Sequence, residues 1–142
     1  LNPTHPPNPA PPRTFLQPKL LPVLEKTKSA YKIWIPIRRN MDRTERFGIG
    51  EKIDSLFLTT METLREATYA SSESKISLLG KAIRSLDSLR FFLQVAWEIK
   101  CIANTQYASL GSEVEEIGRM VGGWRKGLVA KTPPKSGGER KE

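Results

Sequence analysis

An apolar repeat with alternating spacings of three and four residues is the feature that most constrains how this chain can fold. It is clearest near the end of the sequence, in a stripe that consists of Tyr107, Leu110, Val114, Ile117, Val121 and Trp124. This spacing places all of these side chains on one face of an α-helix. The repeat therefore predicts a long helix that buries one side against other helices.

Three earlier segments carry the same repeat. A helix expected at about residues 75–103 has a stripe that consists of Leu79, Ile83, Leu86, Leu89, Leu93 and Ala96. A helix that ends near residue 71 has a stripe that consists of Ile49, Ile53, Leu56, Thr60, Leu64 and Ala67. The weakest stripe, in a helix at residues 22–39, consists of Leu24, Thr27, Tyr31 and Trp34. Four helices are therefore expected, and no segment shows the alternation typical of a strand.

Local signals refine this prediction. Pro36 is expected to loosen the last turn of the first helix, and Asp42 and Glu45 have the spacing of an N-terminal capping pair for the second. The polar links at residues 70–74 and 103–105 are so short that consecutive helices must run in opposite directions. We predict an all-α fold, an antiparallel up-down-up-down four-helix bundle over residues 20–128.

The two ends of the chain have a different composition. Eight of the first 22 residues are proline, which favours an extended, solvated backbone, so residues 1–19 are expected to form a disordered proline-rich tail. Residues 129–142 combine charges with prolines and glycines and contain almost no large apolar side chains, so a second, basic tail is expected there. The first residues lack the basic and apolar regions of a signal peptide, and secretion is not expected.

Positive charge is in excess and is clustered. The chain has 23 Lys and Arg against 15 Asp and Glu, a formal net charge of +8, which favours polyanionic partners. Along the first helix only Glu25 is expected to oppose the cations. The candidate nucleic-acid-binding residues are Lys26, Lys28, Lys32, Arg38, Arg39, Arg43, Arg46, Arg84, Arg90 and Arg119. They would neutralise phosphates without reading base sequence. Tyr31 and Trp34 could stack on bases, although the spacing of Trp34 is more typical of a core residue. A merely solvated basic face is the alternative.

A search for catalytic chemistry finds little. His5, the only histidine, lies in the proline-rich tail, so the folded region lacks the usual general base. Cys101 is the only cysteine, which excludes an internal disulfide and suits a cytoplasmic location. We expect no metal and no cofactor, although a metal-dependent nuclease built on Glu51, Asp54 or Glu113 stays an alternative. No window has the roughly 18 unbroken apolar residues of a membrane span, so no membrane partner is expected.

Three glycines in the last predicted helix need an explanation. Each glycine inside a helix costs about 0.5–1 kcal/mol relative to alanine. Gly111, Gly118 and Gly122 are spaced by seven and four residues, so they form a smooth seam where another helix could approach closely. We interpret this glycine seam as an oligomer contact, and a local bend without a partner is the alternative.

Two stretches resemble a known family. EIGRMVGGW (residues 116–124) and SLRFFL (residues 88–93), supported by RFGIGEKI (residues 46–53), resemble the accessory variability determinant (Avd) family of diversity-generating retroelements. The wider relatives of this family are the four-helix-bundle proteins of ribosomal intervening sequences. Arg90 and Arg119 match arginines of the family, whereas Gln94 departs from the family pattern, which often has a second basic residue there.

The resemblance implies a non-catalytic accessory subunit without a cofactor. It implies a homopentameric basic ring of four-helix bundles that binds the reverse transcriptase of the element and its template RNA or RNA–DNA product. Such a complex makes the adenine-mutagenised cDNA used in mutagenic homing. A helical protein–protein adapter without a nucleic-acid role is the alternative from a different functional class.

Overall fold

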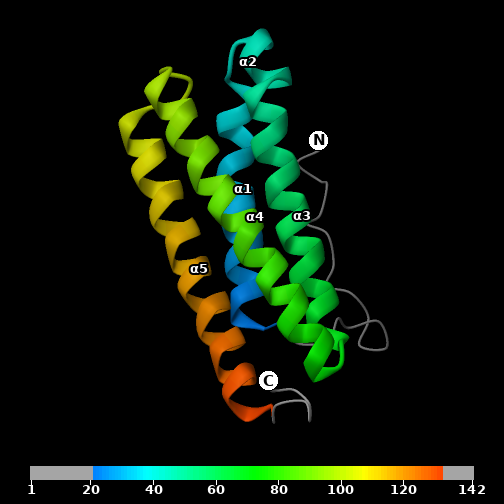
Figure 1. Ribbon diagram of the computed structural model, residues 1–142. Helices are drawn as coiled ribbons and strands as arrows, with labels where there is room; N and C mark the ends of the chain where they lie inside the picture. Colours follow the sequence, from blue (N-terminus) through cyan, green and yellow to red (C-terminus); the bar gives the residue numbers. More distant parts are fainter. Residues whose placement is uncertain (1–20, 133–142) are drawn as a thin grey trace, which may run out of the picture.

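The computed structural model describes residues 21–132, which form four long helices and one short helix (Figure 1). In chain order these are α1 (Pro22–Arg39), α2 (Arg43–Phe47), α3 (Ile49–Tyr69), α4 (Ser72–Glu98) and α5 (Asn104–Lys131). In Figure 1 the chain ascends in α1, descends in α3, ascends in α4 and descends in α5, with α2 at the upper end. No strand occurs in this range, so the predicted all-helical class is confirmed.

Helix α1 has the predicted bounds and passes through Pro36. Its start is favourable because Pro22 occupies the first turn, where the missing backbone donor is not needed. At its end the Asn40 side-chain Nδ2 donates a hydrogen bond to the Pro36 carbonyl at 3.0 Å, and the Met41 amide donates to the Arg38 carbonyl at 3.1 Å. These bonds close the last turn, so the helix continues to Arg39.

The prediction that Asp42 and Glu45 form the N-terminal cap of the second long helix is wrong. Asp42 precedes the short helix α2, and its side chain accepts no capping hydrogen bond. The chain leaves the helical conformation at Gly48, which separates α2 from α3. The backbone is closely packed at Gly50, where an added Cβ would lie 3.0 Å from the Glu45 carbonyl oxygen and 3.1 Å from the Met41 sulfur. Glycine at position 50 therefore lets α2 fold back onto the end of α1.

Both later helices differ from their predicted bounds. Helix α4 begins at Ser72, earlier than expected, because Ser71 caps it by accepting a hydrogen bond from the Ser74 amide at 3.4 Å. Helix α5 continues to Lys131, so residues 129–131, which were assigned to the C-terminal tail, are helical. The Thr132 hydroxyl donates to the Leu128 carbonyl at 2.7 Å and closes this last turn. Residues 1–19 and 133–142 of the predicted tails lie outside the described residues.

The core is a continuous set of apolar side chains contributed by all four long helices. The largest fully buried side chains are Trp34, Phe57, Ile53, Leu64, Leu79, Leu86, Leu89, Leu93, Leu110 and Ile117. The Trp34 and Phe57 rings stack with centroids 6.2 Å apart. Since Trp34 is completely buried, its possible role in stacking on bases was wrong, and it is a packing residue between α1 and α3.

One carboxylate joins α1 to α3 beside this stack. Asp54 Oδ1 accepts hydrogen bonds from the Tyr31 hydroxyl at 2.9 Å and from Trp34 Nε1 at 3.2 Å, and Asp54 Oδ2 lies 3.5 Å from Arg38 Nη1. Burial, together with the bond to Asp54, raises the pKa of Tyr31 above its usual value. The three donors leave Asp54 with little capacity for another partner.

Replacing Asp54 with alanine should destabilise the bundle. The Trp34 indole donor would be left buried without an acceptor, which costs about 1–3 kcal/mol of unfolding free energy. The matched control is Asp87→Ala, because Asp87 pairs with Arg90 on the exposed surface, 3.7 Å away, and such pairs are worth less than about 1 kcal/mol. Urea unfolding followed by circular dichroism measures both variants. Equal loss of stability in the two would contradict the role given to Asp54.

Candidate nucleic-acid and subunit interfaces

Three of the candidate cations form a basic stripe along α1. Lys28, Lys32 and Arg39 are spaced by four and seven residues and therefore lie on the same side of the helix. Lys28 Nζ lies 3.5 Å from Glu25 Oε1, in an exposed pair within the helix. Within residues 21–132, Lys32 and Arg39 form no ion pair, and both side chains are exposed. The basic stripe leads toward the end of the bundle where α2 lies.

Two other α1 cations are joined to carboxylates of neighbouring helices. Lys26 Nζ lies 3.0 Å from Glu113 Oε1 on α5, and Arg38 pairs with Asp54 on α3. The expectation that only Glu25 opposes the α1 cations was therefore wrong. Tertiary packing supplies the other two acids, and Lys26 and Arg38 help hold the bundle together.

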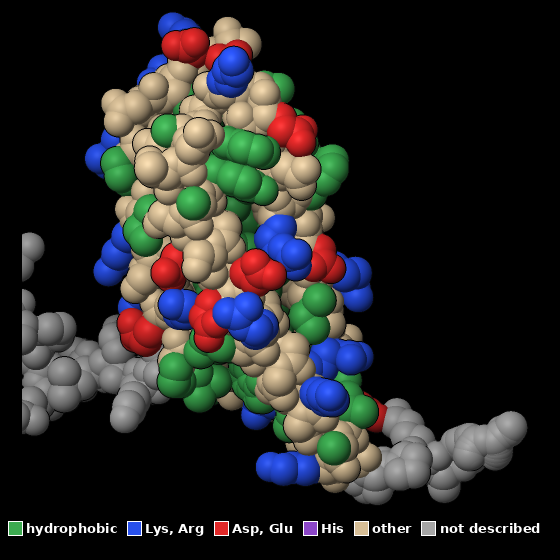
Figure 2. Space-filling view, turned by 90° about the vertical axis from the view of Figure 1, so that its left-hand side faces the viewer, with side chains coloured by type: hydrophobic (Ala, Val, Ile, Leu, Met, Phe, Trp, Pro, Cys, Tyr) green, Lys and Arg blue, Asp and Glu red, His purple; other side chains and the backbone are tan. Residues whose placement is uncertain are grey.

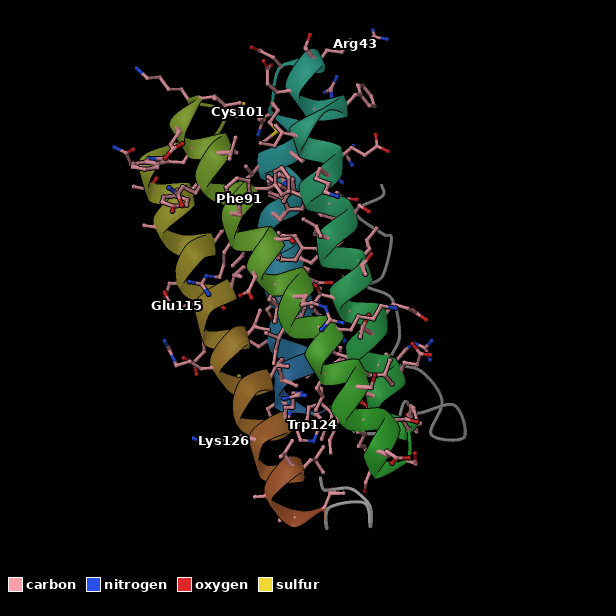
Figure 3. The ribbon with its side chains drawn as sticks, in the orientation of Figure 1. Arg43, Phe91, Cys101, Glu115, Trp124 and Lys126 are labelled. Atoms are coloured by element: carbon pink, nitrogen blue, oxygen red, sulfur yellow. The ribbon has the colours of Figure 1, made fainter. Side chains whose placement is uncertain are left out.

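Arginines gather where α1 meets α2. Arg38 Nε donates a hydrogen bond to the Arg46 carbonyl at 3.2 Å, and Arg46 Nη1 donates to the Arg39 carbonyl at 3.4 Å. Arg43, at the start of α2, lies at the end of the bundle and points away from it (Figure 3). Among the described residues no carboxylate lies within ion-pair distance of Arg39, Arg43 or Arg46.

A cavity of about 300 Å³ lies between these arginines. The residues that line it are Tyr31, Ile35, Arg38, Arg39, Arg46, Phe47 and Asp54. We call it the arginine cavity. Its lining has a formal charge of +2, because three of the predicted cations, all arginines, line it together with one carboxylate.

Arg84 is not brought together with the α1–α2 cations. It lies on α4 beside Gly80, and an added Cβ at Gly80 would be 3.8 Å from Arg84 Nη1 and 3.4 Å from Arg125 Nε. Arg125 itself donates a hydrogen bond to the Ile76 carbonyl at 3.1 Å. The start of α4 and the end of α5 lie at the opposite end of the bundle from α2 (Figure 1). Arg84 therefore belongs to a separate, smaller basic cluster.

Arg90 and Arg119 line a groove between α4 and α5. A cavity of about 720 Å³ and an adjoining one of about 200 Å³ share the lining residues Asp87, Arg90, Glu115 and Arg119. Arg90 pairs with Asp87 and Arg119 with Glu116, each three residues earlier on the same helix. Red and blue side chains alternate on this face in Figure 2, and Glu115 lies on the outer side of α5 in Figure 3. The α4–α5 groove thus has mixed charge.

The glycine seam borders the same groove. Gly111 lines the larger cavity and Gly118 the smaller one, and Gly122 follows on the same side of α5. An added Cβ at any of the three would meet no atom of residues 21–132 within 4 Å, apart from the backbone of its own helix. Packing within the described chain therefore does not require glycine at these positions.

Sequence reasoning missed an aromatic pair above the groove. The rings of Trp97 on α4 and Tyr107 on α5 stack with centroids 4.7 Å apart and an interplanar angle of 9°, and Trp97 Nε1 donates to Asn104 Oδ1 at 2.7 Å. Nearby Phe91 is 60% exposed. Green side chains mark the upper part of this face in Figure 2. The sequence does not reveal this ring stacking, because Trp97 and Tyr107 lie on different helices and meet only when the helices pack.

The carboxylates considered for a nuclease do not come together. Asp54 and Glu113 are engaged by cations of α1, and residues 21–132 contain no group of three or more His, Cys, Asp or Glu side chains suited to hold a metal ion.

None of the helices in the described range combines the length and the apolar character that crossing a membrane requires.

Comparison with known proteins places this bundle in a family. A similar solved structure is that of a protein with unknown function from the S23 ribosomal protein family of Bacteroides thetaiotaomicron, with a TM-score of 0.67 and 21% sequence identity, covering 73% of this chain and 95% of that chain. At this identity the likeness concerns the fold alone. A comparison with curated proteins gave no match. Residues 22–128 match the family model described as bAvd-like, which confirms the resemblance found in the sequence, and the chain belongs to the bAvd-like family.

Proposed function

We propose that this protein is a non-catalytic accessory subunit that binds the reverse transcriptase of a diversity-generating retroelement and its template RNA in the cytoplasm. Membership of the bAvd-like family supports the retroelement role. The observation that carries the nucleic-acid role is that five of the ten candidate cations are exposed or half-buried and have no carboxylate partner among the described residues. These are Lys32, Arg39, Arg43, Arg46 and Arg84.

The basic stripe and the α1–α2 arginines are the proposed RNA surface. Lysine and arginine side chains bind phosphates by releasing condensed counterions, which gives affinity without base readout. The pair between Lys28 and Glu25 is exposed and local, so breaking it costs less than about 1 kcal/mol and leaves Lys28 available to a phosphate. Template RNA held along α1 would remain accessible to the polymerase, which performs the chemistry.

The α4–α5 groove is the proposed protein contact. It combines an open glycine seam, exposed aromatic rings and charges of both signs, a composition suited to contact with another protein surface. We propose that antiparallel four-helix bundles pack through this groove into a homopentameric ring. Arg90 and Arg119 lie at its edge, and their weak local ion pairs leave them available to the polymerase or to nucleic acid.

A protein–protein adapter without a nucleic-acid role is the second candidate. The mixed charge of the α4–α5 groove and the exposed rings of Phe91 and Trp97 favour it. The two functions differ in one property, because only the first requires RNA binding that weakens as salt screens the phosphates.

Neutralising the basic stripe should weaken RNA binding. We expect the double variant Lys28→Gln with Lys32→Gln to bind a single-stranded RNA at least about tenfold more weakly at low salt, because it removes two phosphate contacts. The control is Arg65→Gln with Lys81→Gln. Arg65 pairs locally with Glu62, as Lys28 does with Glu25, and Lys81, like Lys32, forms no ion pair within residues 21–132. Fluorescence anisotropy measures the affinities, and equal affinities of the two double variants would refute the assignment of RNA to this stripe.

Filling the glycine seam should break the assembly without harming the subunit. Five copies of the 16.0 kDa chain give a mass of about 80 kDa. We expect Gly118→Leu with Gly122→Leu to lower the mass measured by light scattering, while helicity is kept, because a Cβ at either position lies in open space.

Gly127→Leu is the control for this experiment, since Gly127 is equally open but lies on another side of α5. It should keep the wild-type mass. If the seam variant keeps both the wild-type mass and the wild-type melting temperature, the seam is not a subunit contact.

A further inference from the structure

The arginine cavity has the properties of a discrete ligand site and not only of a charged surface. Its volume of about 300 Å³ is at the lower end of the roughly 300–1,000 Å³ range of small-ligand pockets. It is formed by the second half of α1, the short helix α2 and Asp54 of α3, and Gly50 allows α2 to approach the end of α1. The cavity therefore depends on the backward fold of α2 onto α1.

The single acid of the cavity is already occupied. Asp54 accepts hydrogen bonds from Tyr31 and Trp34 and pairs with Arg38. Its negative charge is thus held at the α3 side of the cavity. The positive charges of Arg39 and Arg46 remain without a carboxylate within the described part of the chain.

The acids of the α2 segment do not line the cavity. Asp42 and Glu45 are absent from its lining. Burial and then the carboxylates of Glu45 and Asp42 raise the pKa of the Cys101 thiol, which places both acids near the α4–α5 connection instead. The side of α2 that carries Arg46 and Phe47 is therefore free of acidic side chains from its own segment.

Arg46 also has a donor without an acceptor. Its Nε atom is buried and has no hydrogen-bond partner among the described residues. Buried polar atoms are normally paired, so an unpaired guanidinium donor beside a cavity indicates that an acceptor belongs there. The Nε and a terminal nitrogen of a guanidinium form a fork that can bind two phosphate oxygens.

The cavity also has an apolar wall. Phe47 is 60% exposed, and the guanidinium carbon of Arg46 lies 5.3 Å from its ring centroid. Tyr31 and Ile35 also line the cavity. An open aromatic ring beside a phosphate-binding group is the arrangement that lets a nucleic-acid base stack while its phosphate is fixed.

We propose that the arginine cavity binds the phosphate group of one nucleotide, held by the guanidinium groups of Arg38, Arg39 and Arg46, with its base against Phe47. The formal charge of +2 matches the charge of about −1.5 to −2 carried by a terminal phosphate at neutral pH. The phosphate belongs either to the end of an RNA chain or to an internal phosphodiester. In naming RNA as its source, this inference rests on the proposed function.

The test uses the full-length protein and inorganic phosphate as the probe. On titration with phosphate, the Arg46 Nε–H signal in a nitrogen–proton NMR spectrum should shift and saturate, while that of Arg65 should not.

Isothermal titration should show that Arg39→Gln weakens phosphate binding at least about fivefold, whereas Arg65→Gln leaves it unchanged. The Arg39 side chain is exposed and forms no ion pair in residues 21–132, so the variant should fold normally. Arg46→Lys, which keeps the charge but removes the fork, should also bind phosphate more weakly.

The inference is overturned if Arg46 and Arg65 respond alike to phosphate, or if Arg39→Gln and Arg65→Gln bind it equally well. Short oligouridines with a 5′-phosphate or a 5′-hydroxyl then identify the source. If Arg39→Gln lowers the affinity only for the 5′-phosphorylated RNA, the site binds the end of an RNA chain. If it lowers the affinity for both RNAs equally, the site binds an internal phosphodiester. If no RNA binds to the wild type while Arg39-dependent phosphate binding persists, the proposed RNA function fails and the phosphate site stands.

Discussion

The contact of Asp54 with three donors of α1 determines which surfaces of this bundle remain charged. By accepting hydrogen bonds from Tyr31 and Trp34 and pairing with Arg38, Asp54 fixes α1 on α3 and balances the charge of one cation. Lys26 is used in the same way by Glu113 on α5. What remains along α1 is the flank that carries Lys28, Lys32 and Arg39, none of which forms an ion pair with either acid. The basic stripe is thus a consequence of how the helices pack, as much as of the net charge of the chain.

The bundle presents two surfaces of different character. At the α1–α2 end the cations outnumber the acids that face them, which suits a polyanion. Along α4 and α5 the arginines have acids three residues away, the rings of Trp97 and Tyr107 stack, and glycines leave the helix surface open. That combination suits a protein partner. A division of this kind would let one small subunit hold RNA on one side and its neighbours on another, as the proposed function requires.

The sequence allowed the helices to be predicted well because each apolar stripe is a local pattern, and α1 has the expected bounds Pro22–Arg39. The separate short helix α2 before Gly48 was not predicted, because its position depends on the close approach of Gly50 to Met41 and Glu45. The sequence showed which residues are cationic, but it did not show which of them form ion pairs with carboxylates. The partners of Arg90 and Arg119 are close in sequence, whereas those of Lys26 and Arg38 lie on other helices and depend on packing. The role of each cation in binding remains a prediction.

The central claim is that cations on the α1–α2 surface hold RNA through its phosphates. Affinity of the wild-type protein for a single-stranded RNA, measured between about 50 and 200 mM salt, tests it most directly. About four phosphate contacts predict that affinity falls with salt with a logarithmic slope near −3, roughly 50-fold over this range. An affinity that does not change with salt, or the absence of RNA binding at low salt, would contradict the account.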